Sequence, residues 1–230
     1  NMSKLKKFYK NKKVFITGHT GFKGSWLTAV LLKFGAQVTG FSLKDEKKKN
    51  YEKFINFKKI KNIYGDVSDF KKLKSEIKKS KPHILFHLAA QPLVADSYFD
   101  PLSTFNTNFI GSVNIFEIAR KLSIKTVVVI TSDKCYFNKE ILRGYREDDQ
   151  LGGKDPYSAS KASVEIAFQS YMQSFFNSKK GLGVATARAG NVIGGGDWSK
   201  NRIIPDCIRT VIKKKNLLIR SPRSTRPWQH

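Results

Sequence analysis

The chain has 230 residues, a length typical of one large domain or of one domain with part of a second. Hydrophobic residues make up 40% of it and aromatic residues 12%, which excludes a disordered chain and allows a sizeable core. The net charge of +25 raises the hypothesis of nucleic-acid binding, whereas no apolar run is long enough to predict a membrane-spanning helix.

The excess positive charge comes mostly from lysine, which is spread along the chain. The lysine-rich stretches are 4–13, 44–61, 71–81 and 213–215. They fall in predicted loops and on outer helix faces, without a helix-turn-helix pattern or a stripe of basic and aromatic residues. We therefore expect a solvated basic surface that steers anionic substrates, with no nucleic-acid or membrane partner.

The cysteines and histidines indicate neither a disulfide framework nor a metal site. Cys135 and Cys207 lack the spacing of metal ligands, and His83 and His87 are four residues apart in a predicted strand, where packing is the simpler role. The basic N-terminus is not followed by an apolar signal segment. We expect two reduced thiols, no metal and a cytoplasmic location.

In chain order, the apolar patterns predict strands that alternate with helices. The predicted strands cover 13–17, 37–42, 61–64, 83–88, 126–131, 183–188 and 217–220. The predicted helices cover 25–34, 69–79, 103–122, 156–176 and 204–214, and 44–58 is a charged connection. This alternation is typical of βαβ units, so we predict an α/β, Rossmann-like, doubly wound parallel sheet of about seven strands. We expect a dinucleotide-binding domain with the catalytic residues over 1–188 and a partial substrate-binding segment over 189–230.

A glycine-rich turn joins the first predicted strand to the first predicted helix. Its sequence is Gly18-His-Thr-Gly21-Phe-Lys-Gly24. Glycines permit a tight turn and a close approach to pyrophosphate, and the helix N-terminus offers N–H groups to the anion. A purely structural turn is the alternative, but the strand–turn–helix context favours dinucleotide binding. The usual acidic ribose ligand after the second strand is replaced by Ser42, so these residues leave NAD and NADP open.

Two groups of residues indicate proton chemistry. Tyr157 and Lys161 are four residues apart in a predicted helix and therefore share a face. A phenol with an unperturbed pKa of about 10 becomes a better base beside a lysine cation and a positive nicotinamide ring. Ser132, Asp133 and Lys134 end the most apolar strand, at the edge where open sheets bind ligands. Asp133 and Lys134 add the acid and base that an elimination requires; a helix cap and a surface lysine are the alternative.

Seven stretches carry a resemblance to a known family. They are residues 17–26, 87–93, 131–136, 145–147, 155–161, 188–198 and 226–230. Together they resemble the CDP-glucose 4,6-dehydratases, a branch of the extended short-chain dehydrogenase/reductase superfamily. Lys134 stands where the dTDP-glucose relatives have Glu, as in the CDP-glucose branch.

The resemblance implies NAD as the cofactor and a nucleotide sugar as the substrate. The implied catalytic residues are Ser132, Asp133, Lys134, Tyr157 and Lys161. The implied cofactor-binding residues are Gly18, Thr20, Gly21, Phe22, Lys23, Gly24, Ser42, Asp66, Val67, Leu88, Ala89, Ala90, Thr107, Tyr157 and Lys161. The implied substrate-binding residues are Gln91, Ser97, Tyr98, Asn191, Arg202 and Arg226. For several of them simple packing or a surface charge is the alternative.

The implied reaction converts CDP-glucose to CDP-4-dehydro-6-deoxyglucose with loss of water. Tyr157 takes the 4-hydroxyl proton, Lys134 removes the C5 proton and Asp133 protonates the departing 6-hydroxyl. The alternatives are another sugar-nucleotide dehydratase, an epimerase, or a non-catalytic NAD-responsive or RNA-associated module. Because family members continue for on the order of a hundred residues more, a truncated NAD-binding fragment with little activity is a further alternative. We expect a homo-oligomer, dimer or tetramer, that pairs through the helices over 103–122 and 156–176.

Overall fold

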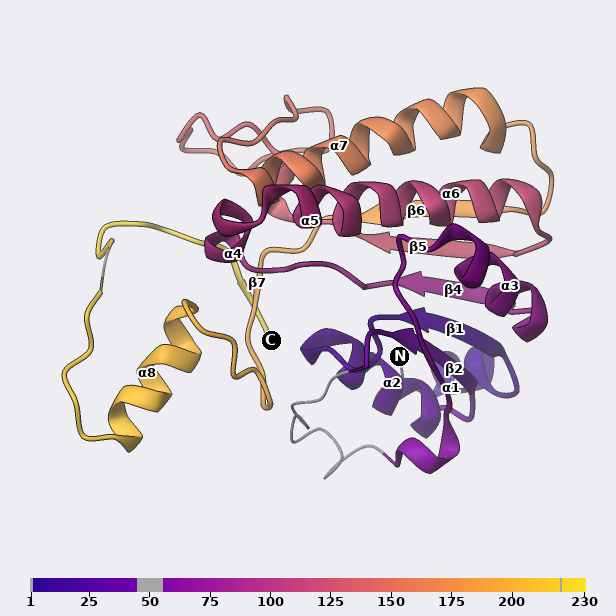
Figure 1. Cartoon of the computed structure of the whole chain (residues 1–230), viewed down its shortest axis with the longest axis horizontal. Coiled ribbons are helices and arrows are strands. Elements are labelled where there is room, and N and C mark those ends of the chain that lie inside the picture. Colours follow the sequence, from indigo (N-terminus) through magenta and orange to yellow (C-terminus); the bar gives the residue numbers. More distant parts are fainter. Residues whose placement is uncertain (1, 45–55, 220) are drawn as a thin grey trace.

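The computed structural model describes residues 2–44, 56–219 and 221–230. Its centre is a six-stranded sheet in the order β3-β2-β1-β4-β5-β6, in which all neighbouring strands are parallel (Figure 1). The strands are β1 (Lys13–Thr17), β2 (Gln37–Ser42), β3 (Lys61–Tyr64), β4 (Ile84–His87), β5 (Thr126–Ile130) and β6 (Gly183–Ala187). The strand order reverses between β1 and β4, and ligands bind at such a switch point. The predicted Rossmann-like fold is confirmed.

Helices cover both faces of the sheet (Figure 1). One face carries α1 (Met2–Tyr9) and α2 (Phe22–Lys33); the other carries α3 (Phe70–Ser80), α6 (Gly111–Lys121) and α7 (Pro156–Tyr171). Short helices α4 (Val94–Phe99) and α5 (Pro101–Phe105) precede α6. Single π-helical turns, η3 (Asn106–Ile110) and η5 (Met172–Phe176), follow α5 and α7, and the 3-10 turns are η2 (Phe57–Lys59) and η4 (Asp133–Cys135).

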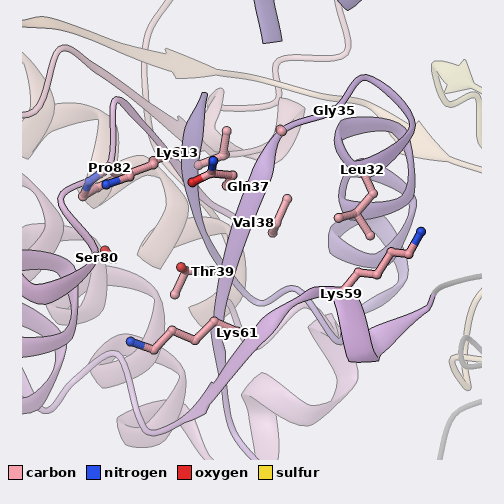
Figure 2. A pocket seen from close by; sticks show the side chains of 12 residues that line it. Lys13, Leu32, Gly35, Gln37, Val38, Thr39, Lys59, Lys61, Ser80 and Pro82 are labelled. Carbon is pink, nitrogen blue, oxygen red and sulfur yellow. The ribbon is translucent and has the colours of Figure 1, made fainter. Parts of the chain in front are cut away.

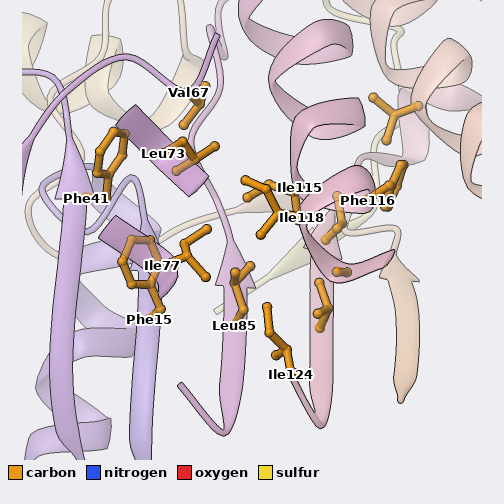
Figure 3. Packing of buried hydrophobic residues seen from close by; sticks show 14 of the residues in the cluster. Phe15, Phe41, Val67, Leu73, Ile77, Leu85, Ile115, Phe116, Ile118 and Ile124 are labelled. Atoms are coloured by element: carbon orange, nitrogen blue, oxygen red, sulfur yellow. The ribbon is translucent and has the colours of Figure 1, made fainter. Parts of the chain in front are cut away.

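The core divides into two clusters because successive strand residues point to opposite faces. Phe15 of β1 belongs to the cluster beneath α3 and α6, with Leu85 of β4 and Ile115 of α6 (Figure 3). Val14 and Ile16 belong to the cluster beneath α2. Burial on both faces explains why the central strands are nearly continuous apolar runs.

The C-terminal segment departs from the sequence-based expectation. Residues 217–219 form no strand, and residue 220 lies outside the described residues. Instead, β7 (Asn191–Val192) pairs with β8 (Trp228–Gln229) in a separate sheet, and α8 (Ile203–Ile212) lies apart from the main sheet (Figure 1). A strand needs a neighbour for its backbone groups, and 217–219 have none, so the prediction of about seven strands is wrong by one among the described residues.

Two helices have no counterpart in the prediction, and one predicted segment lies largely outside the described residues. The helix α1 has eight residues and α4 has six, which is shorter than the window of about 11–18 residues over which a helical period is counted. The expected charged connection over 44–58 falls mostly on residues 45–55, which are not described. No helix in the described part of the chain is long and apolar enough to cross a membrane.

A cavity of about 550 Å³ opens at the amino ends of β1 and β2 (Figure 2). Its lining includes Lys13, Gln37 and Lys61. Parallel strands bind ligands at their carboxyl ends, and none of the site residues expected from the sequence lines this cavity. The candidate site therefore lies at the opposite edge of the sheet.

Candidate active site

The glycine-rich turn after β1 is packed so closely that side chains are excluded from it. Gly18 has a φ of +74°, and a Cβ there would lie 2.7 Å from the backbone nitrogen of Ala89. A Cβ on Gly24 would lie 2.0 Å from the Gly18 carbonyl oxygen. No side chain caps α2 at its N-cap residue, Gly21. The first turn of α2 therefore presents its N–H groups at the switch point, as binding of a pyrophosphate requires.

The ends of β2 and β3 and the turn after β1 supply the positions expected to hold the adenosine half of the cofactor. The Thr20 hydroxyl donates to Ser42 Oγ at 3.1 Å, so the predicted ribose position is a part-buried hydroxyl pair without a carboxylate. Asp66 accepts from the backbone N–H and the hydroxyl of Ser68, both at 2.8 Å, and Val67 is buried. These groups fit the adenosine half of a dinucleotide, and no negative charge at Ser42 repels a ribose phosphate.

The remaining cofactor positions border the same crevice from β4 and η3. Leu88, Ala89 and Ala90 directly follow β4 and are half-buried, as is Thr107 in η3. The Thr17 hydroxyl oxygen accepts from the Ala89 N–H at 3.2 Å, which ties the end of β4 to the end of β1. The small side chains of Ala89 and Ala90 keep the floor of the crevice open.

Tyr157 and Lys161 occupy one buried face of α7. Tyr157 is 9% exposed and Lys161 is 4% exposed. Burial raises the pKa of Tyr157, a hydrogen bond with Ser132 lowers it, and the charge of Asp133 raises it. Burial, and not the charge of Lys161, is therefore the main influence on the pKa of this phenol. Burial lowers the pKa of Lys161 to about 8, and its ammonium donates to the Ile130 carbonyl at 3.3 Å.

The acid and the base expected for an elimination lie together after β5. Ser132 Oγ donates to Asp133 Oδ1 at 2.9 Å and accepts from the Lys134 N–H at 3.2 Å. The Lys134 ammonium lies 3.8 Å from Asp133 Oδ1 and donates to Asn191 Oδ1 at 3.4 Å. Since the charge of Asp133 also acts on Tyr157, the phenol, the acid and Lys134 converge on one region.

Two further cations border this region. Loss of solvation lowers the pKa of Lys23, and the charges of Arg202 and Lys134 lower it further. Arg202 donates to Asp197 at 2.9 Å, which leaves part of its guanidinium for a ligand. Arg226 is exposed and donates to the carbonyl of the preceding residue, Thr225, at 2.6 Å, and no contact of the described residues joins it to the other site residues.

The three other predicted sugar-lining residues have different placements. The Gln91 amide donates to the Leu93 carbonyl and to the Thr104 hydroxyl of α5, both at 3.0 Å, and thereby ties its loop to that helix. Ser97 is buried, and its hydroxyl accepts from the Tyr157 N–H at 3.2 Å. Tyr98 is 64% exposed. Ser97 therefore supports the catalytic helix, and of the three only Tyr98 has a side chain free to turn toward a ligand.

The sequence analysis gave no site role to a buried hydrogen-bond chain beneath the crevice. The Ser112 hydroxyl donates to the Asn108 carbonyl at 2.6 Å, so its oxygen accepts from His87 Nε2 at 3.1 Å. His87 Nδ1 then accepts from the Thr17 hydroxyl at 2.7 Å, which is the neutral form of the ring. Burial lowers the pKa of His87 to about 3, and Lys161 lowers it further.

The same series of hydrogen bonds continues to α7, the helix that carries Tyr157 and Lys161. Asn108 Nδ2 donates to Ser160 Oγ at 2.9 Å, and Ser160 donates to the Tyr157 carbonyl at 2.7 Å. An unbroken series of polar contacts thus connects the end of β1 with α7. The sequence signal for it was the presence of polar residues inside otherwise apolar patterns, most clearly His87 within β4.

A second missed group surrounds a buried carboxylate. Glu165 is 1% exposed and pairs with Arg188 at 2.9 Å. A buried carboxylate requires such partners. Its signal was the charged residue four positions beyond Lys161, on the inward face of the helix. Among the described residues, no group of three His, Cys, Asp or Glu side chains could hold a metal ion.

Comparisons with known proteins agree with this geometry. The chain is 47% identical over 98% of its length to a CDP-glucose 4,6-dehydratase from Salmonella typhimurium, of which it covers 64%. An epimerase structure from Methanothermobacter thermautotrophicus has a TM-score of 0.85 at 25% identity, covering 99% of this chain and 66% of that one. A Thermus thermophilus UDP-glucose 4-epimerase in complex with NAD has a TM-score of 0.69 at 26% identity, covering 82% and 58%. Residues 14–230 match the NAD dependent epimerase/dehydratase family, and the chain belongs to this family.

Proposed function

We propose that this chain binds NAD and a cytidine diphosphate sugar and dehydrates CDP-glucose at C4–C6. One observation carries the proposal: the Lys134 ammonium stands 3.8 Å from the Asp133 carboxylate at the edge of the crevice that also holds Tyr157. An epimerase needs one group to exchange the 4-hydroxyl proton, whereas an elimination needs an additional acid and base. The 47% identity to a CDP-glucose 4,6-dehydratase supports the dehydration and the nucleotide.

NAD fits the glycine-rich turn because the backbone packs so closely at Gly18 and Gly24 that no Cβ is accommodated, which gives the tight turn that brings the first N–H groups of α2 to the switch point. The groups that would hold it are the N–H groups of the first turn of α2, the Thr20 and Ser42 hydroxyls and the residues after β4. When bound, NAD would accept a hydride from the sugar and return it. The NAD-bound epimerase of similar fold supports NAD over NADP.

The residues of this chain divide the proton movements among them. Tyr157, hydrogen-bonded with Ser132, takes the proton of the sugar 4-hydroxyl. The ketone that forms at C4 makes the C5 proton acidic, and Lys134 is placed to remove it. Asp133 is placed to give a proton to the departing 6-hydroxyl, which leaves as water. Lys161 lies one helical turn beyond Tyr157 on the same buried face of α7, where its positive charge would partly offset the rise in the pKa of the phenol that burial causes.

We propose that the substrate lies against residues 189–230. The sequence predicts this stretch as a partial substrate-binding segment that follows the dinucleotide-binding domain over 1–188. Three features support this position. The Lys134 ammonium donates a hydrogen bond to Asn191. The charge of Arg202 lowers the pKa of Lys23. The strands β7 and β8 form a sheet separate from the main one. A guanidinium such as Arg202 suits the diphosphate, because its planar fork matches phosphate oxygens.

The deciding experiment incubates the chain with NAD and, in turn, CDP-, dTDP-, GDP- and UDP-glucose. Formation of a 4-keto sugar is followed by the ultraviolet absorbance that develops in alkali. We expect a signal with CDP-glucose that exceeds the other three. A 4-epimer product without this absorbance would contradict the proposal, as would a larger signal with another nucleotide.

A second candidate function is NAD binding without turnover, for which the glycine-rich turn and the uncapped first turn of α2 are the supporting observation. The chain spans 64% of the similar CDP-glucose 4,6-dehydratase. Titration with NAD, read by quenching of tryptophan fluorescence, would then give binding while no sugar nucleotide reacts. The expectation of no nucleic-acid partner stays a prediction. We propose a cytoplasmic location, which the two free cysteine thiols support.

We also propose that copies of this chain associate through α5–α6 and α7. Exposed apolar side chains on these helices support the proposal: Leu102 is 80% exposed, Ile110 41% and Ile166 56%. Sedimentation velocity is expected to give a dimer or tetramer, and Leu102→Glu combined with Ile166→Glu is expected to shift it to monomer. A wild-type monomer at high concentration would contradict this proposal.

A further inference from the structure

The carboxylate of Glu165 is enclosed at the centre of a polar cluster behind the catalytic face of α7. It lies one helical turn beyond Lys161 and is 1% exposed. Thr131 donates a hydrogen bond to it, Thr186 donates another at 3.0 Å, and Arg188 forms an ion pair at 2.9 Å. Every one of these partners comes from β5, β6 or the residue directly after them. The charge is therefore fixed in place by the sheet.

Arg188 extends the cluster toward the loop that carries the acid and base. Its guanidinium lies 4.9 Å from the ring centroid of Tyr136, and it donates to the Glu147 carbonyl at 3.0 Å. The Tyr136 ring stacks on that of Tyr145 at 5.0 Å. The ion pair with Glu165 thus also secures both ends of the segment that follows Lys134.

Lys161 and Glu165 form hydrogen bonds with two consecutive residues at the end of β5. The Lys161 ammonium donates to the Ile130 carbonyl at 3.3 Å, and the next residue, Thr131, donates to Glu165. Residues four apart on a helix lie on one face. Glu165 is therefore a buried carboxylate on the same face of α7 as the ammonium, and the two side chains are tied to neighbouring residues of the sheet.

The charged and titratable groups that face Lys161 come from four elements. Lys23 faces it from α2, His87 from β4, Cys135 from η4 and Glu165 from α7 itself. Lys23 opposes protonation of Lys161, and His87 is neutral. Burial raises the pKa of Cys135 to about 12, so this thiol is also neutral near pH 7. Of these four groups, only Glu165 brings a negative charge to the buried ammonium.

We propose that Glu165 is a positioning residue whose clamped carboxylate keeps Lys161 protonated beside Tyr157. It touches neither the sugar nor the crevice and acts through Lys161. The inference rests on the proposed function only for its effect on turnover, because the protonation of Lys161 is measurable without substrate. Without this carboxylate, burial and the charge of Lys23 act on Lys161 with no counter-charge against them, and Lys161 then loses its proton at lower pH.

The first test measures the free energy of unfolding by urea between pH 6 and 10 and needs no activity. To isolate the titration of Lys161, the free energy of unfolding of each protein is compared with that of the same protein carrying Lys161→Met. The difference between the two removes the contributions of the other titrating groups. Since folding lowers the pKa of Lys161 to about 8, the folded state binds fewer protons than the unfolded state above that pH, and the difference rises with pH. In Glu165→Gln we expect this rise to begin about one pH unit lower.

The matched control is Glu165→Asp, which keeps the charge but shortens the reach to its three partners. If the role of Glu165 is purely structural, Glu165→Asp and Glu165→Gln lower the free energy of unfolding by similar amounts at every pH, and the pH at which the difference begins to rise stays the same in both. If the charge matters, only Glu165→Gln lowers that pH. An unmoved rise in Glu165→Gln overturns the proposal.

The second test records the pH dependence of kcat and KM with CDP-glucose and NAD. We expect the alkaline fall of kcat to move down by about one unit in Glu165→Gln and to stay in place in Glu165→Asp, with KM changed less than threefold in both. If wild-type chain has no activity, the proposed function fails while the unfolding test still decides the role of Glu165.

A double variant guards against the chance that Glu165→Gln alone does not fold. Glu165→Gln leaves the guanidinium of Arg188 without its counter-charge, so Glu165→Gln combined with Arg188→Gln is prepared in parallel. Arg188 is not among the groups that act on Lys161, and the double variant is therefore expected to show the same lowered onset. If both Gln forms are unfolded throughout while Glu165→Asp folds, the role is in folding, and the proposal is overturned.

Discussion

The ammonium of Lys134 lies 3.8 Å from the carboxylate of Asp133, its neighbour in the sequence. Adjacent residues of a strand point to opposite faces, so this approach depends on the 3-10 turn η4 that begins at Asp133. The Ser132 hydroxyl holds the turn by donating to the Asp133 carboxylate and accepting from the Lys134 N–H. A carboxyl and an amine thus reach the same part of the crevice, where an elimination would use them on neighbouring carbons.

Replacement of Lys134 by Met is expected to stop water loss and leave NAD binding intact. The amine is the proposed base for the C5 proton and is not among the groups proposed to hold the pyrophosphate. We expect the alkali-induced absorbance with CDP-glucose to fall about 10²- to 10⁴-fold, the usual contribution of a positioned base. NAD affinity, measured by calorimetry, is expected to change less than twofold. Lys139→Met, an exposed lysine of the same loop, serves as control; full turnover by Lys134→Met would remove this residue from the mechanism.

Addition of one methyl group at Gly24 is expected to destabilise the fold and abolish NAD binding. The new Cβ would lie 2.0 Å from the Gly18 carbonyl oxygen, which is backbone and cannot swing aside. We expect Gly24→Ala to lower the free energy of unfolding by about 1–3 kcal/mol, as overpacking does. Gly144→Ala is the control, because nothing lies within 4 Å of the Cβ position there. Equal unfolding curves for the two variants would contradict this close packing.

Lys179 is expected to stabilise the end of α6. Its ammonium donates to the carbonyls of Ala119, Arg120 and Leu122 at 2.9, 2.7 and 3.1 Å, groups that the helix end leaves without internal partners. Lys179→Met is expected to lower the free energy of unfolding by about 1–2 kcal/mol. The neighbouring exposed lysine gives the control Lys180→Met, expected within about 0.5 kcal/mol of wild type. Urea denaturation measures both, and a reversed order would refute the cap.

His87 is expected to make stability fall in acid. Its pKa is lowered to about 3 in the folded chain, against about 6.5 in an unfolded one. Between these values the unfolded state binds a proton that the folded state excludes, so the free energy of unfolding decreases as pH falls from 6.5 to 3. His87→Gln retains hydrogen-bonding groups and does not titrate. We expect its urea-unfolding curve to be flatter over this window by a few kcal/mol; identical slopes would show that His87 is protonated in the folded chain.

Local sequence determined most of the fold and the identities of the candidate catalytic residues. Hydrophobic periodicity predicted all six strands of the main sheet, because buried parallel strands are continuous apolar runs bounded by turns. Glycine spacing marked the cradle after β1, and helical spacing placed Tyr157 and Lys161 on one face. These features depend on neighbours within about one turn or one strand, and a single sequence carries that information.

Tertiary structure decided which polar groups meet across the chain. Glu165 and Arg188 are 23 residues apart, and Thr17 and His87 are 70 apart, so no local pattern relates them. The Gln91 amide meets the Thr104 hydroxyl 13 residues further along the chain, and residues 217–219 of a predicted strand found no neighbouring strand among the described residues. Burial and pKa depend on all surrounding elements together, because the cost of an unpaired polar group is set by what the fold places beside it.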